Sequence, residues 1–132
     1  WQYIQHKFPG NIIRSKGLFW IASRPGQALV WGQAGGSLRT DSAGVWWSSM
    51  PYQERTRYAS FVDNKDLIEA KWDVTFGDRK TEIVFIGQDM EEAQIRADLN
   101  ECLSTEEELA TAKWKDGYED NWPIHRAYAL QD

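Results

Sequence analysis

The sequence predicts an α+β domain in which helices pack mainly on one face of an antiparallel sheet. Residues 11–38 have the pattern of two strands joined by a short turn, and residues 83–86 form a further apolar strand. Helical spacing or helix-capping patterns precede, separate and follow these strands. The resulting order is helix–strand–strand–helix–strand–helix–helix, which corresponds to a split βαβ, or ferredoxin-like, plan without its first strand. Such a sheet is expected to have an open edge, at which an isolated fragment could dimerise.

Length and composition indicate one domain over residues 1–132, with an extended or irregular tail at about 115–132. The chain is 42% apolar and 27% charged, as in ordinary soluble globular proteins. One cysteine cannot form an internal disulfide, so a cytoplasmic location is expected. No apolar run approaches the ~20 residues of a membrane helix, and no membrane partner is expected.

Charge is unevenly distributed along the chain. Residues 1–66 hold eight Lys/Arg and four Asp/Glu, a net of +4, whereas residues 67–132 hold seven and sixteen, a net of −9. The total of −5 argues against bulk nucleic-acid binding, because such binding depends on neutralising phosphates. The basic first half still leaves room for a local basic face.

The first strand of the hairpin predicts a basic and aromatic sheet face. Its period-2 pattern places apolar residues on one side (Ile13, Phe19 and Ile21) and a second set on the other (Arg14, Lys16 and Trp20). Residues 23–27 interrupt the pattern. Pro25 and Gly26 predict a type II turn there, with Gly26 at positive φ. Leu38–Thr40 can continue the second strand, and residues 41–44 are expected to form a turn.

Four helical regions are predicted. Residues 1–8 are the end of an amphipathic helix stopped by Pro9 and Gly10, and residues 51–62 have helical spacing. Asp89 with Glu92, and Thr105 with Glu108, predict two helix starts with capping boxes. The helix after Asp89 is expected to bury an apolar row (Ile95, Leu99, Cys102 and Leu103). The strand at 83–86 is apolar on both faces, which indicates either a central strand or a face that meets another domain.

Catalytic and metal-binding patterns are missing from the sequence. There is no GxxxxGK[ST] phosphate loop, GxSxG elbow or HExxH. His6 and His125 lie far apart, and Cys102 is interpreted as a small buried hydrophobe. Four carboxylates could form an acid/base or hard-metal set, but loop capping is the favoured interpretation (Asp73, Asp78, Glu82 and Asp89). No catalytic, cofactor or metal residue is expected in this chain.

Five segments, in this order, resemble the C-terminal domain of the CobW family of GTPases. They are RSKGLFWIASRP, ALVWGQAGGSLR, GVWW, FGDRKTEIVFIG and a helix ending in ECLST. The resemblance covers roughly Gly10 to Trp122. Proteins of this family resemble metal chaperones and cofactor-insertion factors, in zinc transfer and in cobalamin biosynthesis. The resemblance implies a fragment of a P-loop GTPase that uses GTP, Mg and a transition metal, zinc or cobalt, all handled by the part upstream.

The resemblance implies an accessory or regulatory domain whose partners are its own N-terminal GTPase domain and a client metalloprotein. We expect the contact residues among Arg14, Lys16, Trp20, Arg24, Asp78 and Arg79. One alternative is a free-standing module that binds nucleic acid or protein through the face bearing Arg14, Lys16 and Trp20. Another is a stand-alone enzyme that uses the acidic loop carboxylates.

Overall fold

The chain forms a five-stranded, fully antiparallel sheet. The computed structural model describes residues 1–123 and 126–129. The strands are β1 (Ile12–Phe19), β2 (Gln27–Ala34), β3 (Ser37–Val45), β4 (Glu82–Gly87) and β5 (Arg126–Ala129), in the spatial order β4-β1-β2-β3-β5. The predicted α+β class with an antiparallel sheet is confirmed.

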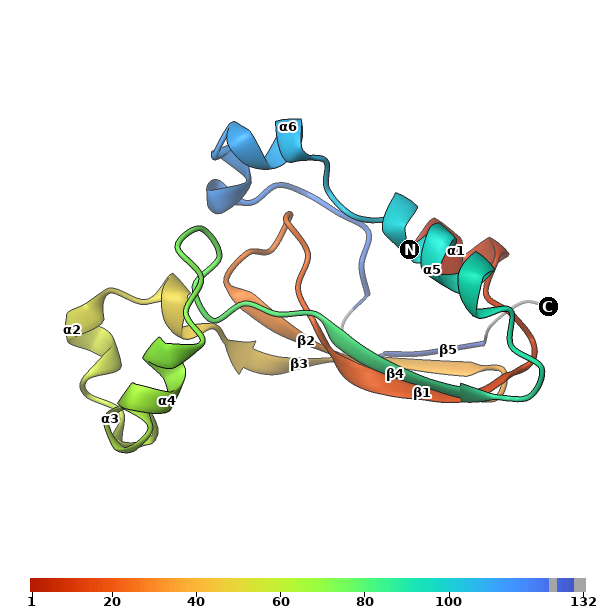
Figure 1. The fold of residues 1–132 in the computed structure, drawn as a ribbon, viewed down its shortest axis with the longest axis horizontal. Coiled ribbons are helices and arrows are strands. Elements are labelled where there is room, and N and C mark those ends of the chain that lie inside the picture. Colours follow the sequence, from red (N-terminus) through yellow and green to blue (C-terminus); the bar gives the residue numbers. More distant parts are fainter. Residues whose placement is uncertain (124–125, 130–132) are drawn as a thin grey trace.

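Helices cover one face of this sheet (Figure 1). Those on the covered side are α1 (Gln2–His6), α5 (Glu92–Glu101) and α6 (Glu106–Ala110), followed by the 3-10 turn η2 (Lys113–Asp116). A separate group lies beyond one end of the sheet: η1 (Trp47–Ser49), α2 (Tyr52–Arg55), α3 (Ala59–Asp63) and α4 (Lys65–Ala70). In the part of the chain that the structure describes, the opposite sheet face carries no helix, as predicted.

The main core lies between the sheet and helices α1 and α5. Sheet residues Leu29, Trp31 and Leu38 are buried against helical residues Ile4 and Ile95. A polar network is buried with them: Trp31 Nε1 donates to Ser15 Oγ at 2.7 Å, and Ser15 donates to Gln33 Oε1 at 2.8 Å. The Gln33 amide nitrogen donates to the carbonyls of Ile12 and Gly35. Every member is therefore satisfied, as buried polar groups require.

The predicted hairpin is formed by β1 and β2, but the assignment of its core side needs one correction. Ile13 is 55% exposed, whereas Ile12 is 1% exposed and belongs to the core. The register of β1 against β4 shifts between Ile12 and Arg14, so Ile13 occupies a bulge. An inserted residue reverses the alternation locally, which a strict period of two cannot anticipate.

The turns also differ from the sequence prediction. Gly26 is outside the left-handed region, and the β1–β2 turn closes through the Gln27 N–H to the Arg24 carbonyl, so the type II assignment is wrong. Gly35 and Gly36 form the two-residue turn between β2 and β3, with Gly35 at φ 55°. Residues 41–44 are part of β3 rather than a turn, because a register shift near Ala28 accommodates the extra residue.

The second half of the chain yields three corrections. Helix α5 begins at Glu92 and Asp89 has φ 52°, so Asp89 is not its cap; Thr105 does cap α6, since its Oγ accepts from the Glu108 N–H. Cys102 is exposed and Leu103 is 63% exposed, because α5 ends at Glu101 and only Ile95 of the predicted row is fully buried. Within the described residues β4 pairs only with β1, so it is an edge strand and not a central one.

Candidate interaction surface

The six residues predicted to make contacts lie in two separate places. Arg14 and Lys16 lie on the sheet face that carries no described helix, hereafter the open face. Trp20, Arg24, Asp78 and Arg79 lie around the β1–β2 turn and make contacts within the chain. The structure thus separates Trp20 from the basic residues with which the sequence pattern grouped it, because β1 ends at Phe19 and the alternation stops there.

The open face is organised in rows of residues paired across the strands. One row runs Val84–Lys16–Gly32–Arg39, and its neighbour runs Ile86–Arg14–Ala34–Ser37. A third row, nearer the β1–β2 turn, runs Glu82–Leu18–Val30–Asp41. Cross-strand partners point to the same side of a sheet, so these side chains share one surface.

This face combines cations with exposed aliphatic side chains. Arg14, Lys16 and Arg39 are exposed, and within residues 1–123 none of them forms an ion pair. Val84 and Ile86 are 58% and 57% exposed. A shallow pocket of about 410 Å³ lies over the paired strands β1 and β4 here, lined by Arg14, Lys16, Val84 and Ile86 with Glu82.

Arg39 is a member of this face that the sequence prediction missed. Its neighbours Leu38 and Thr40 are both fully buried, so the alternation along β3 places Arg39 on the opposite side. The signal was present in the sequence, because Leu38–Thr40 were predicted to continue a strand and the alternation there already places Arg39 opposite Leu38.

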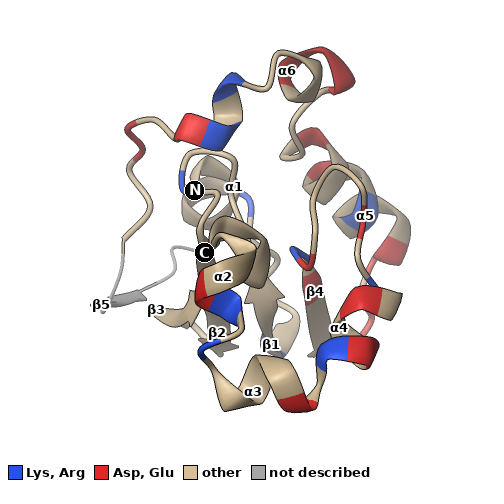
Figure 2. Ribbon diagram, turned by 90° about the vertical axis from the view of Figure 1, so that its left-hand side faces the viewer, with Lys and Arg blue, Asp and Glu red and all other residues tan. Residues whose placement is uncertain are grey.

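Acidic residues gather elsewhere on the molecule. Helices α5 and α6 carry several of the acidic segments on the covered side (Figure 2). The first turn of α6 alone contains Glu106, Glu107 and Glu108. The net charge of −5 therefore conceals a basic open face on an otherwise acidic domain.

Arg79 is the centre of the second group. Its guanidinium donates to the carbonyls of Pro25 at 2.6 Å and Phe76 at 3.0 Å, and to Ser49 Oγ at 3.3 Å. It also lies 5.7 Å from the Trp20 ring centre and 5.5 Å from that of Trp114. Burial lowers the pKa of Arg79, and the neighbouring Asp78 carboxylate partly opposes this effect. The contacts hold the β1–β2 turn against η1 and the loop that precedes β4.

Asp78 and Arg24 have comparable roles. The Asp78 carboxylate accepts from the backbone N–H groups of Trp47 and Ser48, both at 2.9 Å, and so caps η1. Arg24 pairs with Asp120 at 2.8 Å and donates to the Trp122 carbonyl. It thereby fastens the segment bearing Trp122 to the β1–β2 turn.

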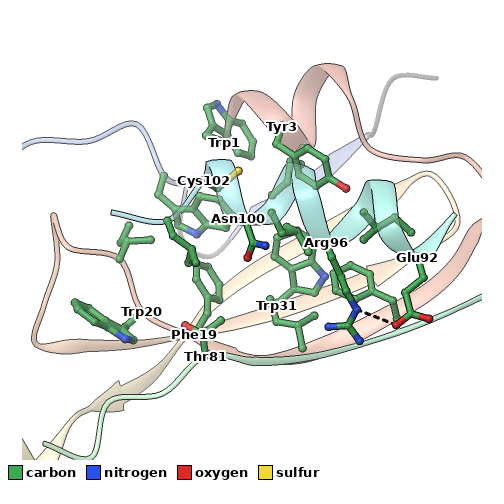
Figure 3. A pocket seen from close by; sticks show the side chains of 18 of the residues that line it. Trp1, Tyr3, Phe19, Trp20, Trp31, Thr81, Glu92, Arg96, Asn100 and Cys102 are labelled. Carbon is green, nitrogen blue, oxygen red and sulfur yellow. Dashed lines mark hydrogen bonds and ion pairs between the residues drawn. The ribbon is translucent and has the colours of Figure 1, made fainter. Parts of the chain in front are cut away.

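A cleft of about 850 Å³ lies between α5 and the sheet, on the β4 side (Figure 3). Its walls are largely aromatic, including Trp1, Phe19 and Trp31, and its rim carries Thr81 and Asn100. Arg96 and Glu92 pair with each other at 2.8 Å beside it. Most of its lining is the exposed side of the hydrophobic core.

No catalytic or metal-binding geometry is found in the described part of the chain. No three His, Cys, Asp or Glu residues gather there in a way that could hold a metal ion. Asp73 accepts from the N–H groups of Thr75 and Phe76 and caps its own loop, as Asp78 caps η1. His125 lies outside the described residues. Of the helices described, none is long and apolar enough to cross a membrane.

Comparison with known proteins gives one family model and several related proteins that match most of this chain. Residues 1–103 match the cobalamin synthesis protein cobW C-terminal domain. The chain is 36% identical over 105 residues to zinc-regulated GTPase metalloprotein activator 1 of Dictyostelium discoideum, covering 79% of this chain and 21% of that protein. It is 31% identical over 112 residues to a zinc chaperone of Mycobacterium tuberculosis, covering 83% of this chain and 27% of that protein. The chain thus spans about a quarter or less of the length of these relatives. No solved structure matches it.

Proposed function

The chain belongs to the cobalamin synthesis protein cobW C-terminal domain family, and from this premise we propose that it is the contact domain of a GTP-dependent metal chaperone. The metal is zinc, in keeping with the names of two relatives, although cobalt remains the other candidate from the resemblance. In this proposal GTP, Mg and the metal are bound by a part of the protein outside these 132 residues. The domain's own task is to contact the GTPase domain and a client metalloprotein.

The open face of the sheet is the observation that supports this function. The uncovered face of an antiparallel sheet is usually polar, whereas this one carries Val84 and Ile86, more than half exposed, next to Lys16 and Arg14 and on the same face as Arg39. A surface that mixes charged and apolar side chains is typical of transient protein–protein interfaces. Such interfaces are about as polar as the rest of the protein surface.

The proposal is tested by hydrogen exchange on the whole chaperone in its GTP-analogue and GDP forms with Mg. We expect protection of amides in β1, β2 or β4 to depend on the nucleotide, because a contact domain changes its contacts when the GTPase domain changes state. Addition of Zn²⁺ and the client is expected to alter the same exchange. Identical exchange throughout this domain in both nucleotide forms, with and without client, would contradict the proposal.

A further inference from the structure

The open face has the features of a docking surface, and its charges restrict what can dock there. Lys16 and Arg39 flank Gly32 in one row, so their Cα atoms are about 10 Å apart, two interstrand spacings. Arg14 lies one row along on the same strand as Lys16. Since none of the three forms an ion pair within residues 1–123, their charges are available to a partner that carries carboxylates.

Gly32 leaves room for a partner to approach this surface closely. A glycine inside a strand weakens the sheet, and often marks a place where a ligand or another backbone comes near. The fold does not require glycine here, because an added Cβ would meet nothing nearer than the Arg39 carbonyl oxygen at 3.8 Å. Gly17, in the adjacent strand, is the opposite case: its Cβ would lie 2.0 Å from the Glu82 carbonyl oxygen.

The partner segment is a helix rather than an extended strand. An extended peptide obtains its backbone hydrogen bonds from a sheet edge, whereas the open face presents side chains only. A helix satisfies its own backbone groups and can lie flat on such a surface. The shallow pocket lined by Val84 and Ile86 accepts its apolar stripe, and Arg14, Lys16 and Arg39 accept its flanking carboxylates.

Nucleic acid fits this face less well than protein does. Single-stranded recognition uses aromatic side chains as stacking platforms. Trp20 packs instead against Phe76 and Trp114, with ring centres 5.6 Å and 5.4 Å apart. The described side chains of the open face are aliphatic, small or charged.

We propose that the open face of β1, β2, β3 and β4 binds an acidic amphipathic helix of the client protein, with its carboxylates on Arg14, Lys16 and Arg39 and its apolar stripe over Val84 and Ile86. The proposal rests on the proposed function, because it names the client surface that this contact domain recognises. The client is expected to bind reversibly and not to cover the face permanently. Burying a charge permanently is costly unless it is paired, and Arg14, Lys16 and Arg39 form no ion pair within residues 1–123.

The probe is a synthetic amphipathic helix with leucine on one face and glutamate on its flanks, titrated into the labelled chain by NMR. A peptide with lysine in place of glutamate and an oligouridylate of equal length are the comparison ligands. We expect binding of the glutamate peptide only, weakened by salt, with shifts confined to β1, β2, β3 and β4. Binding of the lysine peptide, preference for oligouridylate, or shifts centred on the cleft under α5 would overturn the proposal.

Paired variants separate the surface from the fold. Arg14→Glu with Arg39→Glu is expected to weaken binding about tenfold or more, whereas Lys71→Glu, an exposed lysine next to α4, leaves it unchanged. Gly32→Val is expected to keep the fold and reduce binding by obstructing the face. Gly10→Val is its control, because an added Cβ at Gly10 has no neighbour within 4 Å. Full binding by folded Gly32→Val and by the double charge variant would refute the assignment.

The peptide titration contains neither nucleotide nor GTPase domain, so its outcome is independent of the outcome of the exchange experiment. If the acidic helix does not bind while exchange in this domain still depends on nucleotide, the helix proposal is wrong and the contact function stands. If the helix binds but nucleotide and client leave the exchange unchanged, the open face is a binding site and the contact function is wrong.

Discussion

Arg79→Ala is expected to destabilise the domain by about 3 kcal/mol. Arg79 was predicted from the sequence as a contact residue, but its guanidinium donates to the carbonyls of Pro25 and Phe76 within the chain. A residue committed to internal hydrogen bonds contributes to folding before it contributes to any partner. The variant therefore measures how much the internal contacts of Arg79 contribute to the free energy of unfolding.

The magnitude follows from the contacts. A hydrogen bond from a charged donor contributes about 1.5–3 kcal/mol, and the lower value suits a group that is only part-buried. Two such bonds give about 3 kcal/mol. The ring contacts to Trp20 and Trp114 add about 0.5 kcal/mol each, which water reaching the vacated carbonyls offsets. For a chain of 132 residues about 3 kcal/mol corresponds to a fall in Tm of roughly 12 °C.

Urea denaturation followed by tryptophan fluorescence measures this change, and eight tryptophans provide the signal. Arg14→Ala on the open face is the control and is expected to change the free energy of unfolding by less than about 0.5 kcal/mol. Arg79→Lys should lie between, because lysine keeps the charge without the planar fork. If Arg79→Ala and Arg14→Ala have equal stability, the internal contacts of Arg79 are energetically unimportant and the reasoning fails.

Three further changes test the buried polar groups and a helix cap. Burial disfavours the ionised form of Tyr3 in the folded state and raises its pKa to about 12 from 10.0. The free energy of unfolding is therefore unaffected by this group below pH 10 and falls as the pH rises to about 12, and Tyr3→Phe should reduce this alkaline loss in urea denaturation. At pH 7 Tyr3→Phe should be neutral or stabilising, since the hydroxyl is buried without a hydrogen-bond partner in the described residues, and a marked loss would contradict that environment. Ser15→Ala should cost about 1–3 kcal/mol, because the Trp31 N–H loses its acceptor, and an unchanged urea midpoint would contradict the network. Thr105→Ala should lower protection of the Glu108 amide in hydrogen exchange and leave β1 unchanged; unchanged Glu108 exchange would show that the cap contributes nothing.

The hairpin and the capped α6 could be predicted from the sequence because their determinants are local. Strand alternation, a proline in a turn and a Thr–Glu capping box each operate within a few residues. The position of Ile12 in the core could not, because Ile12 and Ile13 are chemically identical neighbours and a bulge decides between them. That bulge depends on the pairing of β1 with β4, which is some 70 residues away in the chain.

The edge position of β4 was missed for a related reason. Four successive apolar residues, 83–86, suggested cover on both sides, yet only Ile83 and Phe85 face the helices. An apolar strand can be buried on both faces, but its sequence does not show whether the element that covers each face belongs to the same chain. The alternative drawn from the sequence, that the second face meets another domain, stays a prediction.

The separation of Trp20 from Arg14 and Lys16 changes the character of the open face more than any other difference. Alternation holds only while the backbone is extended, and β1 ends at Phe19, so Trp20 turns toward Phe76 and Arg79. Arg39 joins Arg14 and Lys16 on the open face because β3 runs uninterrupted past it. A face with tryptophan between cations suits stacked bases, whereas a face with valine and isoleucine beside three cations suits an amphipathic acidic helix. The class of partner that suits this face thus depends on the end of β1 at Phe19 and on the continuation of β3 past Arg39. Both are properties of the assembled sheet and not of either segment alone.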